Sequence, residues 1–175
     1  MIQYKQCNLF DAPKGSIIIH ACNSQGMWGS GIAAAFSKLY PQSYEWYRGF
    51  CREWNERRGT ACGRAELMKF VEEPHYVGYV VTSHDYGLYR DDPELIKINT
   101  TIALQQLCDR IYSLFDQYSC PTVDVYSNKF NSGLFAVPWN ESELILQTVL
   151  RDFPRINWIV CSGEDKDVKE SSQAV

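Results

Sequence analysis

The sequence predicts an α/β protein of one domain, built as a three-layer α/β/α sandwich around a mixed central sheet. Strand-like and helix-like segments alternate along most of the chain. A buried, β-branched run at residues 17–19 leads through a glycine-containing loop into a helix-like segment at residues 32–39, which is a phosphate-binding layout. The length of 175 residues, with 45% hydrophobic residues, suits a single domain with a substantial core.

The first half of the chain supplies two strands, besides the run at 17–19, and a pair of helices. Residues 1–6 alternate weakly and predict a first strand that ends in a turn. Proline separates the short helix at 32–39 from a second helix at 42–58. Residues 63–70 predict a further strand. The second helix carries a stripe that we expect to pack in the core rather than to hold a cofactor: Tyr44, Tyr47, Cys51 and Trp54.

The second half continues the alternation. Residues 75–82 are apolar enough to form a central strand, and Asp-Asp-Pro-Glu starts a long helix that reaches about residue 118. We expect one face of this helix to cover the sheet: Leu95, Ile98, Ile102, Leu107, Ile111, Leu114 and Phe115. A strand at 122–126, a helix that Asn140 caps and a last strand at 157–161 complete the pattern. We expect residues 1–162 to form the domain and the polar residues 163–175 to be a disordered tail.

Charge and cysteine usage exclude several classes of function. The net charge of −4 and the isoelectric point near 5.4 argue against non-specific binding to nucleic acid. The seven cysteines form no C-x-x-C pair, and no signal peptide precedes the first strand, so we expect reduced thiols in a cytoplasmic compartment and no metal site. No apolar run approaches the roughly 20 residues that span a bilayer. We expect a monomer that binds a small molecule.

The loop after the strand at 17–19 is the strongest functional signal. Its glycines, at 26, 29 and 31, fit neither the P-loop, which needs a Lys after the last Gly, nor the G-x-G-x-x-G dinucleotide fingerprint. Backbone N–H groups would therefore hold a phosphate here. A tight turn without a ligand is an equally good interpretation of an isolated glycine loop. A polar group at the end of the strand favours function, because α/β sheets bind ligands there: His20, Asn23, Ser24 and Gln25.

Two segments together resemble a known family. The first is Asn-x-x-Gly-x-Trp-Gly-x-Gly-Ile-Ala, starting at Asn23 and preceded by Ile-His-x-Cys. The second is Asn-Ser-Gly-Leu-Phe-Ala-Val-Pro-Trp at residues 131–139. Both resemble the phosphate loops of the macro domain, within its branch of ADP-ribose 1″-phosphate phosphatases. The resemblance covers residues 1 to about 162 and implies the macro domain fold.

The resemblance implies a binding site for ADP-ribose between the two loops. One side of the diphosphate and terminal ribose would be flanked by Gly29, Ser30, Gly31 and Ile32, and the other by Ser132, Gly133, Leu134 and Phe135. The turn at Asn8 and Leu9 would meet the adenine, where macro domains commonly carry an Asp. The amide of Asn8 still offers an acceptor, although Asn8 as a simple turn former is an equally good interpretation.

The resemblance also implies two catalytic residues. Asn23 matches the asparagine that macro domains place against the terminal ribose, where it would orient the water or the substituted hydroxyl. His20 resembles the histidine of the phosphatase branch and would exchange a proton near neutral pH. The alternative for His20 is a structural residue at the end of a buried strand. Asp85 is the best candidate for a partner of His20, by loop position alone.

Three functions follow from these expectations. The first is a phosphatase that converts ADP-ribose 1″-phosphate to ADP-ribose and phosphate. The second is a hydrolase of protein-linked or acetylated ADP-ribose, but its lysine-dependent form is disfavoured, since Ser83 and Phe135 stand where a sister branch has Lys and Asp. The third is a non-catalytic ADP-ribose-binding module. None of these requires a metal or another cofactor.

Overall fold

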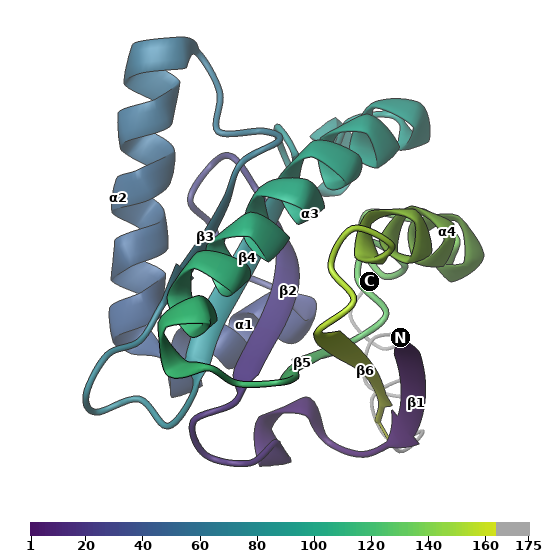
Figure 1. Cartoon of the computed structure of the whole chain (residues 1–175). Helices are drawn as coiled ribbons and strands as arrows, with labels where there is room; N and C mark the ends of the chain where they lie inside the picture. Colours follow the sequence, from purple (N-terminus) through teal and green to yellow (C-terminus); the bar gives the residue numbers. More distant parts are fainter. Residues whose placement is uncertain (164–175) are drawn as a thin grey trace.

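The computed structural model describes residues 1–163 and contains one six-stranded sheet with helices on both faces (Figure 1). The strands are β1 Ile2–Gln6, β2 Ile17–Asn23, β3 Ala65–Met68, β4 Tyr76–Ser83, β5 Val123–Ser127 and β6 Ile156–Ser162. The α-helices are α1 Gly31–Leu39, α2 Pro41–Arg58, α3 Pro93–Phe115 and α4 Trp139–Leu150, with short 3-10 helices at Leu9–Asp11, Gly87–Tyr89 and Asp116–Tyr118. The tail predicted at 163–175 lies, apart from its first residue, outside the described residues.

The sheet is mixed, as predicted. Its strand order is β1-β6-β5-β2-β4-β3, and every neighbouring pair is parallel except β3 and β4, which are antiparallel. The central strand β2 pairs with β5 on one side and β4 on the other. Because the five parallel strands end at the same edge, the loops after β2, β4 and β5 meet there.

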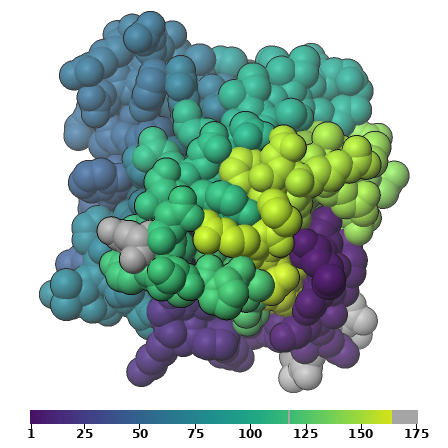
Figure 2. Space-filling model, viewed as in Figure 1, coloured from purple at the N-terminus to yellow at the C-terminus, as the bar shows by residue number. Residues whose placement is uncertain are grey.

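Alternating side chains of β2 build a separate core on each face of the sheet. Ile17 and Ile19 pack with α3 and α4 in one apolar cluster, whereas Ile18 and Cys22 pack with α1 and α2 in the other. Figure 1 shows α3 in front of the sheet and α1 behind it. The three predicted layers are therefore present. In Figure 2 the N-terminal segment lies directly against the C-terminal part of the described chain, in agreement with the pairing of β1 and β6.

Helix α3 begins as predicted but turns a different face to the sheet. Asp92 caps its first turn by accepting a hydrogen bond from the Leu95 N–H at 3.0 Å. The buried stripe runs instead through Ile96, Asn99, Thr100, Ala103, Leu104, Leu107, Cys108 and Ile111. Ile98 and Ile102 are 57% and 54% exposed, so the predicted face is wrong in the first half of the helix. The apolar pattern did not predict this face, because two of its buried residues, Asn99 and Thr100, are polar.

Those polar residues fasten α3 to the functional edge of the sheet. The Asn99 amide donates to the carbonyl oxygen of Thr82 at 3.1 Å, and the Thr100 hydroxyl accepts from Asn131 at 2.9 Å. Each bond satisfies a buried polar group that burial alone would leave unpaired. The helix is therefore held in register with the end of β4 and with the loop that follows β5.

Helix α2 is capped by a residue from a distant turn. The buried carboxylate of Glu73 accepts from the backbone N–H groups of Gln42 and Ser43 at 2.9 and 3.0 Å, and from the Ser43 hydroxyl. A carboxylate at a helix N-terminus satisfies free N–H groups and complements the helix dipole. Helix α4 starts differently from the prediction: Asn140 lies inside it and Pro138 occupies the cap position, so Asn140 is not its cap.

Candidate active site at the carboxyl edge of the sheet

A cavity of about 440 Å³ opens between the loop after β2 and the loop after β5. Its volume lies within the range of small-molecule sites. It is lined by Ala21, Cys22, Asn23, Met27, Gly29, Ser30, Gly31, Ile32, Ala33, Tyr86, Asn128, Lys129, Phe130, Asn131, Gly133, Leu134 and Phe135. Those residues come from the carboxyl end of β2, the start of α1 and the two loops, where the strand pattern predicted a ligand.

The side chain of Asn23 shapes the first loop. Its Oδ1 accepts from the backbone N–H groups of Gln25 and Met27 at 2.9 and 3.3 Å and from the Tyr47 hydroxyl at 3.0 Å. Its Nδ2 donates to the carbonyl oxygen of Met27 at 2.8 Å. An amide nitrogen carries two hydrogens. One N–H of Asn23 therefore remains available beside the cavity.

Ser24 holds the same loop from the other side. Its hydroxyl donates to Asn55 of α2 at 2.7 Å and accepts from the Ala61 N–H at 3.0 Å. Its backbone N–H donates to the carbonyl oxygen of Ser83, at the end of β4, at 2.9 Å. The loop is therefore tied both to helix α2 and to the neighbouring strand before it reaches the glycines.

The start of α1 forms one wall of the cavity. Gly31 has φ +57°, a conformation that favours glycine, and Ser30 at the cap position makes no side-chain hydrogen bond to the helix. The first N–H groups of a helix have no partner within it, and in α1 they belong to Gly31, Ile32 and Ala33, which all line the cavity. The positive end of the helix dipole thus faces the cavity and favours an anion.

The second loop is anchored through Asn131. This residue is buried and has φ +65°. Its Oδ1 accepts from the Thr82 hydroxyl at 2.9 Å, and its Nδ2 donates to the Thr100 hydroxyl at 2.9 Å. Its carbonyl oxygen accepts from the Val137 N–H at 2.9 Å. The loop is therefore fixed to both β4 and α3, and Gly133 to Phe135 project from this anchor along the cavity wall.

Most of the predicted site residues meet at the cavity. They are Asn23, Gly29, Ser30, Gly31, Ile32, Gly133, Leu134 and Phe135. Ser132 is outside the lining, and its hydroxyl donates to the carbonyl oxygen of Lys129. Asn8 caps the first 3-10 helix by accepting from the Phe10 N–H at 2.9 Å, and Leu9 is buried in the core. Neither residue lines the cavity.

His20 lies behind the cavity, inside the core between β2 and α1. It is fully buried, stacks on Phe36 at a centroid separation of 4.1 Å and meets the edge of Trp28 at 4.5 Å. Neither ring nitrogen has a hydrogen-bond partner among the described residues, Asp85 included. Burial lowers the pKa of His20 to about 3, so the ring is neutral near pH 7. This placement argues against direct proton exchange between His20 and a ligand in the cavity.

Several lining residues were not anticipated from the sequence. Lys129 is the only charged residue that lines the cavity within residues 1–163. Tyr86 reaches the lining from the loop after β4. Asn128 contributes a buried Oδ1 for which the described residues offer no hydrogen-bond partner. Cys22 is also present, but burial raises the pKa of its thiol, so it is not a ready nucleophile.

The chain is similar to several known proteins. It is 36% identical over 148 residues to an ADP-ribose 1″-phosphate phosphatase of Chaetomium globosum, and the aligned region covers 81% of this chain and 80% of that protein. It is 31% identical over 179 residues to a protein of the same name from Aspergillus oryzae, covering 85% and 89%. The macrodomain of Thermus aquaticus DarG superposes with a TM-score of 0.71 at 22% identity, covering 93% and 98%. No family model matches the chain.

Proposed function

The chain belongs to the family of the ADP-ribose 1″-phosphate phosphatases, and on this basis we propose that it hydrolyses ADP-ribose 1″-phosphate to ADP-ribose and phosphate. The observation that carries the proposal is the cavity between two glycine-containing loops, with a helix N-terminus in its wall and a lysine as its charged residue. The cavity contains no carboxylate among the described residues that would repel a phosphate. This combination suits an anionic ligand held largely by backbone.

The two loops have separate tasks in this proposal. The free N–H groups of Gly31, Ile32 and Ala33 bind phosphate oxygens from the α1 side. Backbone N–H groups of Gly133 to Phe135 approach the ligand from the opposite wall. Both loops are fixed by buried hydrogen bonds, the first through Asn23 and Ser24 and the second through Asn131. The donors are therefore in place before the substrate binds, which is how electrostatic stabilisation of a transition state is best supplied.

We assign Lys129 to the phosphoryl group that is removed. The backbone donors can hold the diphosphate, but the substrate carries an additional phosphate with further negative charge. A lysine contributes a point charge that stabilises phosphate oxygens as charge moves during transfer. ADP-ribose lacks this phosphate, so loss of Lys129 is expected to affect turnover more than ADP-ribose binding.

Asn23 orients the reacting groups through its remaining amide N–H. Since Oδ1 and one N–H already hold the loop, only one donor is left for the terminal ribose or the attacking water. His20 supports this arrangement indirectly, by stacking on Phe36 and thereby setting the position of α1. The contact of Asn8 and Leu9 with adenine stays a prediction, as does the monomeric state. Within residues 1–163 no helix is long and apolar enough to cross a membrane.

The proposal is tested by phosphate release from ADP-ribose 1″-phosphate. We expect Lys129→Met to lower kcat/KM about 10- to 100-fold, equivalent to about 1.4–2.7 kcal/mol of transition-state stabilisation. Calorimetry should show ADP-ribose affinity within a few-fold of that of the unchanged protein. Lys38→Met is the matched control, because Lys38 is an exposed lysine in the last turn of α1, away from the cavity.

Two results would count against these assignments. Equal losses in Lys129→Met and Lys38→Met would show that overall charge, rather than Lys129, governs the rate. Clear ADP-ribose binding without any phosphate release by the unchanged protein would reject the phosphatase and leave a binding module or a hydrolase of another ADP-ribose linkage.

A further inference from the structure

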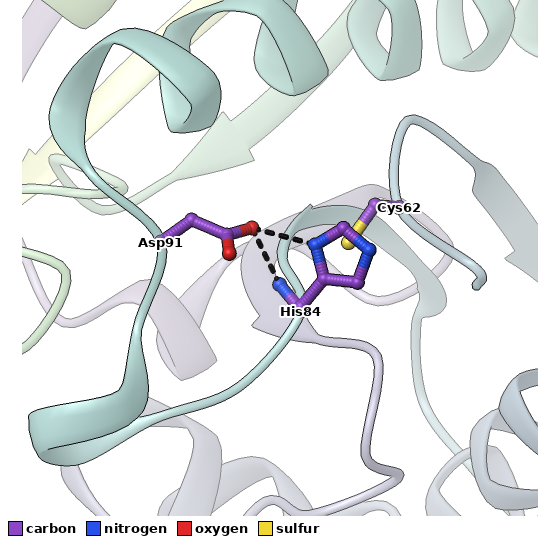
Figure 3. Close-up of side chains that lie close together, drawn as sticks. All are labelled: Cys62, His84 and Asp91. Carbon is purple, nitrogen blue, oxygen red and sulfur yellow. Dashed lines mark hydrogen bonds and ion pairs between the residues drawn. The ribbon is translucent and has the colours of Figure 1, made fainter. Parts of the chain in front are cut away.

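Three side chains that commonly bind metals converge on a second site, outside the cavity lining. Cys62 comes from the segment between α2 and β3, whereas His84 and Asp91 flank the segment that leads from β4 to α3 (Figure 3). Potential ligand atoms of the three residues all lie within 4.8 Å of one another. In Figure 3 the Cys62 and Asp91 side chains both point toward the imidazole ring of His84. None of the three residues lines the cavity.

The donor set fits one class of cation. A thiolate and an imidazole select zinc-like ions over magnesium or calcium, which prefer oxygen ligands, and one carboxylate completes three protein ligands. Zinc bonds of about 2.0–2.3 Å place tetrahedral ligand atoms roughly 3.3–3.8 Å apart. The ligand atoms lie within 4.8 Å of one another, so a movement of about 1 Å brings them to this spacing. The thiolate and the carboxylate together balance the charge of a divalent ion.

Hydrogen bonds hold the ligands near this geometry. Asp91 Oδ2 accepts from His84 Nδ1 at 2.9 Å and from the His84 backbone N–H at 2.8 Å. The Asp91 N–H donates to the Ser83 hydroxyl at 3.0 Å. The Cys62 N–H donates to the Thr60 hydroxyl at 3.0 Å, and the next residue, Gly63, donates to β4 through the carbonyl oxygen of Val81 at 2.9 Å. Three separate segments are thus fixed around one point before an ion arrives.

An ion can reach the site from solvent. The His84 side chain is 46% exposed and that of Asp91 is 13% exposed, while Cys62 is partly buried. One side of the site is therefore open and the other is enclosed. A three-ligand site of this kind leaves the fourth tetrahedral position to water.

We propose that Cys62, His84 and Asp91 bind a zinc-class divalent cation; the Cys62 thiol releases its proton to solvent as the thiolate coordinates, and the His84 ring keeps its one proton on the nitrogen that does not coordinate. The segment between His84 and Asp91 carries Tyr86, which lines the cavity. Gln25 of the first loop also donates to the carbonyl oxygen of His84, at 3.1 Å. The bound ion therefore holds both ends of the Tyr86 segment and connects them to the segment that precedes β3. This inference is independent of the reaction proposed for the cavity.

The test uses the full chain, treated with chelator and then titrated with Co²⁺. We expect one cobalt per chain, a thiolate-to-cobalt charge-transfer band, and displacement of the cobalt by Zn²⁺. Cys62→Ser should abolish the band, and Asp91→Asn should weaken binding at least about tenfold, because each removes one of three ligands. Matched controls are Cys120→Ser, a partly buried thiol elsewhere, and Asp85→Asn, a neighbouring carboxylate outside the cluster. Both should bind like the unchanged protein.

A second measurement guards against misfolded variants. Zinc should raise the melting temperature of the unchanged protein and of both controls, but not that of Cys62→Ser, whose metal-free melting temperature should be close to that of the parent. Absence of a thiolate band in the unchanged protein would overturn the proposal. So would a band that survives in Cys62→Ser but is lost in Cys7→Ser, because Cys7 and Cys161, whose Sγ atoms lie 2.8 Å apart, would then hold the ion.

Discussion

Replacing His20 with leucine should remove a large part of the acid sensitivity of the fold. His20 is buried without a hydrogen-bond partner among the described residues, and burial lowers its pKa from 6.5 to about 3. The unfolded chain therefore binds a proton that the folded chain excludes. Above about pH 6.5 neither state binds this proton and the fold keeps its full stability. The free energy of unfolding then decreases as the pH falls from there toward 3.

The size of the effect follows from the two pKa values. Each pH unit between them changes the free energy of unfolding by about 1.4 kcal/mol, so the full loss is about 5 kcal/mol. Between pH 7.5 and pH 4.5 the loss is about 3 kcal/mol. At pH 7.5, His20→Leu should change stability little. It removes two unpaired ring nitrogens, a gain of about 1–3 kcal/mol, but loses aromatic stacking of about 0.5–1.5 kcal/mol and leaves some packing space.

Urea unfolding at pH 7.5 and 4.5 measures this difference. His20→Leu should lose about 3 kcal/mol less than the unchanged protein between the two pH values. Phe36→Leu is the control, because it alters the same aromatic cluster without a titratable group and should destabilise the fold equally at both pH values. If His20→Leu loses as much stability on acidification as the unchanged protein, the neutral, desolvated state assigned to His20 is refuted.

Three further substitutions test the fold and the site. Gly78→Ala should cost about 1–3 kcal/mol in urea unfolding, since its Cβ would overlap the buried side chain of Ile19; unchanged stability would contradict this packing. Glu73→Gln should lower the melting temperature, at a cost of about 1–3 kcal/mol, because the new NH2 group replaces an acceptor for Ser43 and the charge at the start of α2 is lost. Gly31→Ala should weaken ADP-ribose binding in calorimetry by about tenfold, because alanine at φ +57° is strained by about 1–2 kcal/mol and relieves the strain by moving the N–H donors at the start of α1; unaltered affinity would argue against this glycine as a ligand contact.

The order of the elements was predictable from local patterns. Each predicted strand and α-helix is present, with bounds that differ by a few residues, because apolar periodicity and Pro or Gly breaks act over short distances. The two loops that line the cavity could be located in the sequence, since their glycines and flanking strand ends are local features; their role in binding stays a prediction. Long-range hydrogen bonds were not predictable. The capping of α2 by Glu73 and the anchoring of Asn131 both depend on residues far away in the chain.

The least predictable feature of the site was the direction of individual side chains. Alternation along β2 places Ile18, His20 and Cys22 toward α1 and α2, but the sequence does not say which face borders the cavity. Lys129 and Tyr86 reach the cavity only because two loops fold together at the sheet edge. The Cys62, His84 and Asp91 cluster has no short ligand spacing, so counting cysteines suggested no metal site there.

A side-by-side turnover measurement would identify the bond that the chain breaks. The unchanged protein would be given ADP-ribose 1″-phosphate, glutamate-linked ADP-ribose and acetylated ADP-ribose at equal concentrations, and the initial rates of phosphate and ADP-ribose release compared. We predict that kcat/KM for the 1″-phosphate exceeds the other two values by at least about tenfold, because Lys129 gains a charged partner only with that substrate. Release of ADP-ribose from either other substrate, with no phosphate release from the 1″-phosphate, would contradict the assignment of the chain as a phosphatase.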